Sequence, residues 1–166
     1  MKPHLAPACR IVFVCTGNIC RSPTAEAVMR HRLQRAGLAG QVELDSAGTH
    51  AWHQAEPPDP RSIAHAARRG YDLTALRARR LEERDYQHFH LLLAMDAQHL
   101  RHMRAACPPD QHGRLKLLLD FGPARAGQPV PDPYYGGAEG FEHVLDLVEQ
   151  GCDGLLRHLQ HSLPQY

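Results

Sequence analysis

The apolar residues of the chain follow two alternating spacings, and this alternation predicts the order of its secondary structure. Short apolar runs, rich in β-branched residues or leucine, are typical of buried strands; they cover residues 11–14, 42–44, 90–95 and 115–118. Apolar residues at helical spacing lie between and after these runs; they predict helices at residues 22–36, 62–69, 81–87, 96–105 and from 141 onward. Strands that alternate with helices indicate an α/β protein with a mostly parallel sheet.

The ends of these elements complete the predicted architecture. Ser22 and Pro23 are typical of a helix start, with Ser22 as the N-cap and Pro23 at the first helical position. Residues 1–9 are expected to form a flexible tail, and the Gly- and Pro-rich stretch 121–140 is expected to be a loop. The chain has 166 residues, the size of one domain. We therefore expect a single domain over residues 1–166, with a four-stranded parallel sheet and helices on both faces.

Composition and charge restrict the classes of partner. The chain carries 19 Lys plus Arg and 18 Asp plus Glu, a net charge of +1. This balance provides no excess of positive charge that would favour binding to nucleic acid or to an anionic membrane. No apolar run approaches the ~20 residues of a membrane span, and the first ten residues lack the apolar core of a signal peptide. We expect a cytoplasmic protein, either a monomer or a weak homodimer.

Cysteine and histidine content argues against a disulfide framework and against a metal site. Five cysteines, an odd number without a secretory signal, are expected to be thiols. Thirteen histidines are scattered along the chain, and none forms an HExxH motif. Pairs such as His99 and His102 are therefore expected to be solvated or half-buried imidazoles. The sequence predicts neither a metal nor another cofactor.

The segment that follows the first predicted strand combines residues suited to phosphate chemistry. Cys15 ends the strand, and the amides of a loop that enters a helix favour an anion, whether thiolate or phosphate. Gly17 permits a tight curl, and Asn18 tolerates left-handed backbone. Arg21 has a planar fork that matches two phosphate oxygens, and Ser22 can hydrogen-bond the sulfur. This segment therefore supplies a nucleophile, a cradle for an oxyanion and a clamp.

Cleavage of a phosphate ester also needs a proton donor for the leaving oxygen, and three aspartates qualify by context. Asp59 and Asp96 each precede a predicted helix, so each has an alternative explanation as a helix cap. Asp132 lies in the long loop and adjoins two tyrosines. The spacing alone favours Asp132 without excluding the other two.

Two motifs together resemble a known family. Residues 15–23, CTGNICRSP, and residues 132–135, DPYY, resemble the low-molecular-weight protein tyrosine phosphatases. The resemblance extends over nearly the whole chain and includes DSAG at 45–48, PDPR at 58–61 and MD at 95–96. It implies the fold of that family, with a phosphate-binding loop after the first strand.

The resemblance also implies an activity on phosphotyrosine in proteins and on small aryl phosphates. Cys15 would attack phosphorus and form a cysteinyl-phosphate, while Asp132 would protonate the leaving phenolate and then activate water. The phosphate-binding loop would comprise Thr16, Gly17, Asn18, Ile19, Cys20, Arg21 and Ser22. The substrate ring would lie between Trp52 and Tyr134, with Tyr135 in the same wall.

Two further implications concern support and redox chemistry. Asn18 and Ser46 would hold the loop in shape through hydrogen bonds. Cys20 would form a disulfide with Cys15 under peroxide and so protect it from irreversible oxidation. One departure from the family pattern is Leu76, where many relatives have a histidine in the same network. Leucine cannot donate a hydrogen bond, so we expect a softer loop or a less acidic nucleophile, with the chemistry retained.

Three alternative functions stay open at this point. A protein-arginine phosphatase is a sibling activity, although members of that group resemble CTGNTCRS, with threonine where this chain has Ile19. An arsenate reductase needs a relay of further cysteines, and Cys107 and Cys152 are not paired as such a relay would be. A non-catalytic phosphotyrosine-binding module would have lost the nucleophile or the acid, and both Cys15 and Asp132 are present.

Overall fold

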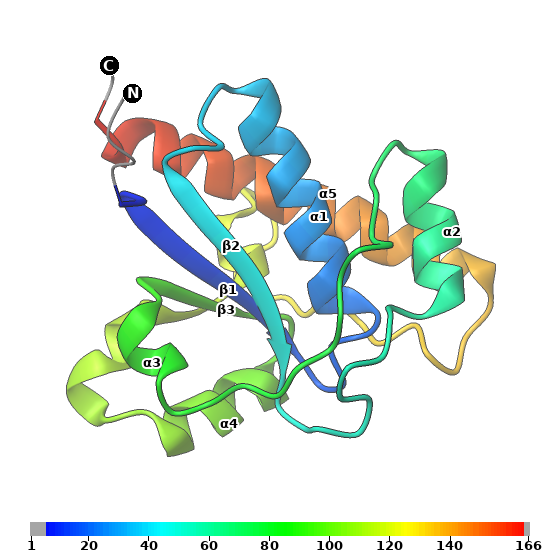
Figure 1. Cartoon of the computed structure of the whole chain (residues 1–166), viewed down its shortest axis with the longest axis horizontal. Helices are drawn as coiled ribbons and strands as arrows, with labels where there is room; N and C mark the ends of the chain where they lie inside the picture. The colour runs from blue at the N-terminus through cyan, green and yellow to red at the C-terminus, as the bar shows by residue number, and fades with distance from the viewer. Residues whose placement is uncertain (1–5, 165–166) are drawn as a thin grey trace.

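A parallel sheet with the strand order β2-β1-β3-β4 forms the centre of the structure (Figure 1). The computed structural model describes residues 6–164. The strands are β1 (Cys9–Cys15), β2 (Val42–Gly48), β3 (Leu91–Ala94) and β4 (Leu115–Leu117). The predicted four-stranded parallel sheet is therefore confirmed, and the strand that ends in Cys15 lies inside it, between β2 and β3.

Helices cover both faces of this sheet, as the sequence predicts. One face carries α1, α2 and α5, and the opposite face carries α3 and α4 (Figure 1). The helices are α1 (Arg21–Arg35), α2 (Pro60–Arg68), α3 (Asp85–His88), α4 (Ala97–Ala106) and α5 (Ala138–Ser162), with two 3-10 turns, η1 (Pro109–Arg114) and η2 (Leu118–Phe121).

Residues 11–14 of β1 form an uninterrupted apolar run because helices cover both faces of the sheet. Ile11 and Phe13 belong to the core on the α1 and α5 side, whereas Val12 and Val14 belong to the core on the α3 and α4 side. Successive side chains of a strand point to opposite faces, and both faces are covered here, so apolar side chains are needed on both.

Two strand boundaries differ from the sequence prediction by more than one residue. β2 continues to Gly48, four residues beyond the predicted end at Leu44, because it pairs with β1 along its whole length. Its later residues include Asp45 and Ser46, whose polarity hides a strand from pattern reading. β1 begins at Cys9, so the last residue of the expected tail is buried in the sheet. The first five residues of that tail lie outside the described part of the chain.

The start of α1 also differs from the prediction. The helix begins at Arg21, with Cys20 in the N-cap position, so Ser22 is not the N-cap. No side chain among the described residues caps this first turn. The Ser22 hydroxyl is used elsewhere, as described below, and the open amides of the helix start face the loop. The predicted helix end is confirmed, because Gly37 follows α1 in a left-handed conformation with φ +73°.

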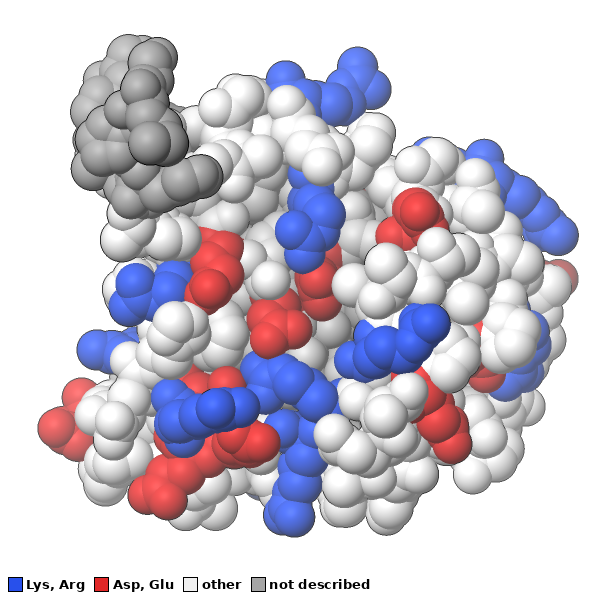
Figure 2. Space-filling view, viewed as in Figure 1, with Lys and Arg blue, Asp and Glu red and all other residues white. Residues whose placement is uncertain are grey.

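The surface agrees with the balanced composition. On the face seen in Figure 2, charged side chains of both signs are interspersed over the described residues. No helix within residues 6–164 is both long enough and apolar enough to span a membrane. Between η2 and α5 the chain runs through the predicted long loop, which brings Asp132 toward the carboxyl end of the sheet.

Candidate active site

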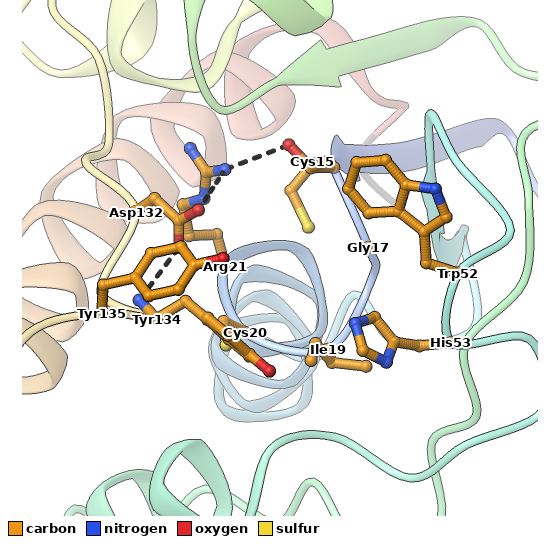
Figure 3. A pocket seen from close by; sticks show the side chains of 11 residues that line it. Cys15, Gly17, Ile19, Cys20, Arg21, Trp52, His53, Asp132, Tyr134 and Tyr135 are labelled. Atoms are coloured by element: carbon orange, nitrogen blue, oxygen red, sulfur yellow. Dashed lines mark hydrogen bonds and ion pairs between the residues drawn. The ribbon is translucent and has the colours of Figure 1, made fainter.

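A pocket of about 220 Å³ opens beyond the carboxyl end of β1, the edge where parallel sheets bind ligands. In Figure 3, the Cys15 sulfur lies between Trp52 and His53 on one side and Asp132, Tyr134 and Tyr135 on the other. The lining residues are Cys15, Thr16, Gly17, Ile19, Cys20, Arg21, Trp52, His53, Asp132, Tyr134 and Tyr135.

The loop after β1 is fixed against the end of β2 by backbone contacts. The Thr49 amide donates to the Cys15 carbonyl at 2.9 Å, and the His50 amide donates to the Thr16 carbonyl at 3.1 Å. A Cβ atom at Gly48 would lie 2.6 Å from the Thr16 carbonyl oxygen. Glycine at this position therefore lets the two segments approach closely, and the DSAG motif helps to shape the loop.

The sulfur of Cys15 has a hydroxyl partner that is oriented by a third residue. Ser22 Oγ lies 3.0 Å from Cys15 Sγ and accepts a hydrogen bond from Asn18 Nδ2 at 2.8 Å. Because the Asn18 amide donates to this oxygen, the Ser22 hydroxyl can point its own proton at an ionised sulfur, in place of its long contact of 3.5 Å to the Ala47 carbonyl. The start of α1 adds its amides on the same side, and such amides favour a negative charge.

Asn18 holds the loop from beneath, in a conformation that few residues adopt. Its φ is +58°, in the left-handed region that Asn tolerates. Its side chain donates to Ser46 Oγ at 3.0 Å as well as to Ser22, and it accepts from the Arg79 amide at 3.1 Å. Ser46 donates in turn to Glu26 Oε1 at 2.8 Å. Asn18 and Ser46 thus pair with each other, one of the arrangements expected for a chain with leucine at position 76.

Glu26 completes this network from inside α1. Its side chain is buried and accepts hydrogen bonds from Ser46 and from Arg30 Nη2, the latter at 2.6 Å. Burial raises the pKa of the Glu26 carboxyl, and the hydrogen bonds from Ser46 and Arg30 partly offset that rise. Leu76 is half-buried and packs against the core on the α1 and α5 side. Glu26 therefore accepts the hydrogen of Ser46, and the Arg79 amide donates to Asn18, so both side chains beneath the loop have partners.

Arg21 is buried beside the loop and is held mainly at one end of its fork. Nη1 donates to Asp96 Oδ2 at 2.8 Å and to the Val130 carbonyl at 3.1 Å. Nη2 has only longer contacts, 3.4 Å to His99 Nε2, 3.5 Å to Thr16 Oγ1 and 3.7 Å to Asp132 Oδ2. A buried guanidinium needs partners, and this arrangement satisfies one end and leaves the other available for a phosphoryl group.

The three candidate acids lie in different surroundings. Asp59 and Asp96 are the N-caps of α2 and α4, accepting from the amides of Arg61 at 2.8 Å and His99 at 3.0 Å. Hydrogen bonds from Arg61 lower the pKa of Asp59. Burial opposes ionisation of Asp96, but the His99 amide and Arg21 outweigh it and keep the pKa of Asp96 below its usual value. Asp132 is the one of the three that lines the pocket.

Aromatic side chains form two opposite walls of the pocket (Figure 3). Trp52 is 68% exposed and is stacked by His50, whose ring centre lies 4.3 Å away. Tyr134 and Tyr135 meet edge to face at 4.9 Å, and Arg61 donates to the Tyr134 carbonyl at 3.0 Å. Contacts with His50 and Arg61 therefore hold the two walls, while Trp52, Tyr134 and Tyr135 still line the pocket.

Cys20, in the loop after β1, lines the pocket and is buried. Burial raises its pKa to about 12, and the charges of Asp59, Cys15 and Asp132 add to the rise despite a hydrogen bond from Ser62. Cys20 is therefore a neutral thiol near pH 7. All five cysteines are free thiols in the structure. Cys152 lies on α5 and is buried in the core on the α1 and α5 side.

Several residues of the site are absent from the sequence prediction. His99 is buried, with Nε2 2.8 Å from Thr16 Oγ1, so the expectation of a solvated or half-buried imidazole is wrong for it. Glu26, Val130 and His53 carry no motif signal, although the His53 ring lies against Gly17 and lines the pocket. Within residues 6–164, no group of three or more His, Cys, Asp or Glu side chains is arranged to hold a metal ion.

Comparisons with known proteins agree with this geometry. Residues 10–165 match the family model described as low molecular weight phosphotyrosine protein phosphatase. The chain is 49% identical over 157 residues to the low molecular weight protein-tyrosine-phosphatase of Streptomyces coelicolor, covering 93% of this chain and 95% of that protein.

Solved structures show the same likeness in three dimensions. The crystal structure of YfkJ from Bacillus subtilis superposes with a TM-score of 0.89 at 35% identity, covering 96% of this chain and 99% of that one. A protein tyrosine phosphatase from Entamoeba histolytica gives a TM-score of 0.88 at 35% identity, covering 92% of this chain and 97% of that one. The chain therefore belongs to the low molecular weight phosphotyrosine protein phosphatase family.

Proposed function

We propose that this member of a family of phosphoric monoester hydrolases cleaves phosphotyrosine in proteins, and small aryl phosphates, through a cysteinyl-phosphate. The observation that carries the proposal is the placement of the Cys15 sulfur at the pocket, with Arg21 beside it and Asp132 across from it (Figure 3). These three side chains supply a nucleophile, a phosphate clamp and a proton donor within one cavity. Cys15, Arg21 and Asp132 are the catalytic residues of the proposal.

In the first step, the Cys15 thiolate attacks phosphorus and forms an S–P bond while the bond from phosphorus to the phenolic oxygen breaks. The free Nη2 end of Arg21 and the amides of residues 16–22 stabilise the negative charge of the phosphoryl oxygens. Asp132 gives its proton to the leaving oxygen, so that tyrosine departs neutral. General acid catalysis of this kind typically contributes ~10²–10⁴-fold.

In the second step, Asp132 acts as a base. It takes a proton from water, whose oxygen attacks phosphorus, and the S–P bond breaks to release inorganic phosphate and the thiolate. The Ser22 hydroxyl, held 3.0 Å from Sγ by Asn18, stabilises the sulfur anion both before attack and as it leaves. Asp132 is half exposed, so the water that it activates in this step can reach it from solvent.

The walls of the pocket support an aromatic ester as substrate. Trp52 on one side and Tyr134 on the other offer flat apolar surfaces to a phenyl ring. Ile19, in the loop itself, adds an apolar side chain where a flexible guanidine-type substrate would find no partner. We assign the partner of the enzyme as a tyrosine-phosphorylated protein.

Phosphate release from a phosphotyrosine peptide and a phosphoarginine peptide, with EDTA present, tests the proposal on the wild type and Cys15→Ser. We expect phosphotyrosine turnover that disappears in the variant. Cys107→Ser is the matched control, because Cys107 is a buried thiol outside the pocket. Turnover of phosphoarginine alone would overturn the assigned substrate, and full activity of Cys15→Ser would overturn the mechanism.

A further inference from the structure

His99 connects α4 to the phosphate-binding loop from a buried position. Its ring nitrogen Nε2 lies 2.8 Å from Thr16 Oγ1 and 3.4 Å from Arg21 Nη2. Its other ring nitrogen, Nδ1, lies 3.2 Å from Asp96 Oδ1. The side chain is 2% exposed. One imidazole thus touches the loop, the arginine and the carboxylate that holds the arginine, and the two-step mechanism uses none of these contacts.

The partners of the imidazole assign its tautomer. An arginine nitrogen only donates, so the Nε2 atom beside Arg21 must present its lone pair. The ring proton is then on Nδ1, which faces the Asp96 carboxylate without hydrogen-bond geometry. The Thr16 hydroxyl then donates its hydrogen to Nε2, and its oxygen accepts from Arg21. Burial and the positive charge of Arg21 lower the pKa of His99 to about 4, although Asp96 and Asp132 act in the opposite direction. The ring is therefore neutral near pH 7.

The contacts of Arg21 show what this lone pair contributes. Asp96 and Val130 occupy Nη1, whereas Nη2 is shared among His99, Thr16 and Asp132 at 3.4, 3.5 and 3.7 Å. Without an acceptor at His99, the strongest remaining attraction on Nη2 is the Asp132 carboxylate. A guanidinium that turned toward Asp132 would leave the phosphoryl position and would also pair with the proposed acid.

We propose that neutral His99 is a positioning residue that holds the free end of the Arg21 fork beside the loop and away from Asp132. This inference rests on the proposed function, because it assigns His99 a role in binding the phosphoryl group. The long contacts on Nη2 are weak enough to be exchanged for phosphoryl oxygens, yet they set the direction of the fork before substrate arrives. His99 therefore reduces the reorganisation that phosphate binding requires.

Titration with inorganic phosphate tests this directly, because Trp52 is the single tryptophan of the chain and lines the pocket. Its fluorescence reports binding independently of turnover. We expect His99→Leu to weaken phosphate binding roughly tenfold, the effect of losing one hydrogen bond to a charged group. We expect His99→Gln, whose amide oxygen reaches the position of Nε2, to recover most of the affinity. With a phosphotyrosine peptide, His99→Leu should raise KM more than it lowers kcat.

His102→Gln is the matched control, since His102 is an exposed imidazole on the same helix; its phosphate affinity should stay at the wild-type value. A folded His99→Leu variant with wild-type phosphate affinity would overturn the proposal. If the His99→Leu variant does not fold, Thr16→Val provides the test, because it removes the hydroxyl that His99 binds. Unchanged phosphate affinity in Thr16→Val would also overturn the proposal. If the wild type binds phosphate but hydrolyses no phosphotyrosine, the proposed function fails while these titrations still test His99.

Discussion

The proposed phosphate-binding loop and the loop that carries Asp132 face the same pocket but are built in opposite ways. Arg21 is 4% exposed at its side chain, and the Asp132 side chain is 50% exposed. The first loop is enclosed by β1, β2 and α1, and its side chains bond to one another. The second is a Gly- and Pro-rich connection on the surface, in which Asp132 accepts one backbone hydrogen bond, from the Tyr134 amide at 3.0 Å.

The difference follows from what each loop has to do in the proposed mechanism. A site that stabilises an oxyanion works best when its donors are fixed before the reaction. A group that protonates the leaving oxygen and then activates water must instead be accessible to that water. The rigid support beneath Cys15 and the exposure of Asp132 each suit the proposed role of that residue, so variants in the two loops should lose different parts of the reaction.

The largest effect should come from the clamp of the enclosed loop. Arg21→Lys keeps the positive charge but removes the planar fork that binds two oxygens. We expect kcat/KM for a phosphotyrosine peptide to fall roughly 10³-fold, comparable to losing a principal oxyanion donor, together with weaker binding of inorganic phosphate. Arg80→Lys, at an exposed position outside the pocket, serves as the control. Near-normal activity of Arg21→Lys would show that charge alone suffices.

A change at the exposed loop should reduce turnover and leave phosphate binding intact. For Asp132→Asn we expect kcat to fall roughly 10²-fold with phosphotyrosine and less with p-nitrophenyl phosphate, because that leaving group needs less protonation. Inorganic phosphate should bind as in the wild type. Glu139→Gln, at an exposed position just after this loop, should retain full activity. An equal loss with both substrates would argue against Asp132 as the acid.

The support beneath the enclosed loop should have an intermediate effect. Asn18→Ala removes hydrogen bonds to Ser22, Ser46 and the Arg79 amide and places alanine at a φ of +58°. We expect kcat/KM to fall roughly tenfold, from the ~1–2 kcal/mol cost of left-handed backbone and the lost contacts. Leu76→His should change kcat/KM little, because the network is already closed by Glu26. A large gain in Leu76→His would show that the loop is softer than its contacts indicate.

The last expected effect is on stability rather than on activity, and it comes from His99, which contacts the enclosed loop. The pKa of His99 is about 4 in the folded protein against an ordinary value of 6.5, so between these values the unfolded chain binds the extra proton. Stability should therefore fall as pH falls through this window, by at most about 1.4 kcal/mol per pH unit from this group. Chemical unfolding at several pH values should show a shallower slope for His99→Gln than for the wild type, and equal slopes would contradict the assignment.

The sequence predicts the enclosed loop well because its signals are local. The apolar run of β1, the glycine and asparagine of the loop and the Ser-Pro helix start lie within about a dozen consecutive residues. The error at Ser22 has a physical cause. A serine at a helix start is expected to cap it, but this hydroxyl bonds to Cys15 and Asn18 instead.

Contacts of the site between residues far apart in the sequence could not be predicted from such local signals. His99 meets Thr16 across 83 positions of sequence, and nothing near His99 distinguishes it from twelve other histidines. β2 is longer than predicted because pairing with β1, rather than its own hydropathy, extends it past Asp45 and Ser46. The sheet order, which decides these neighbours, depends on packing and not on local propensity.

The backbone of Val130 divides the surface loop into two stretches that tolerate changes of chain length differently. This buried residue donates its amide hydrogen to the Met95 carbonyl at 2.8 Å and accepts from Arg21 at 3.1 Å. Asp132 follows only two positions later. Residues inserted at 123–128 would bulge into solvent and leave the acid where it is. A single residue inserted after Val130 would displace the acid by up to ~3.8 Å, so evolution or engineering can lengthen this loop only on the upstream side of that anchor.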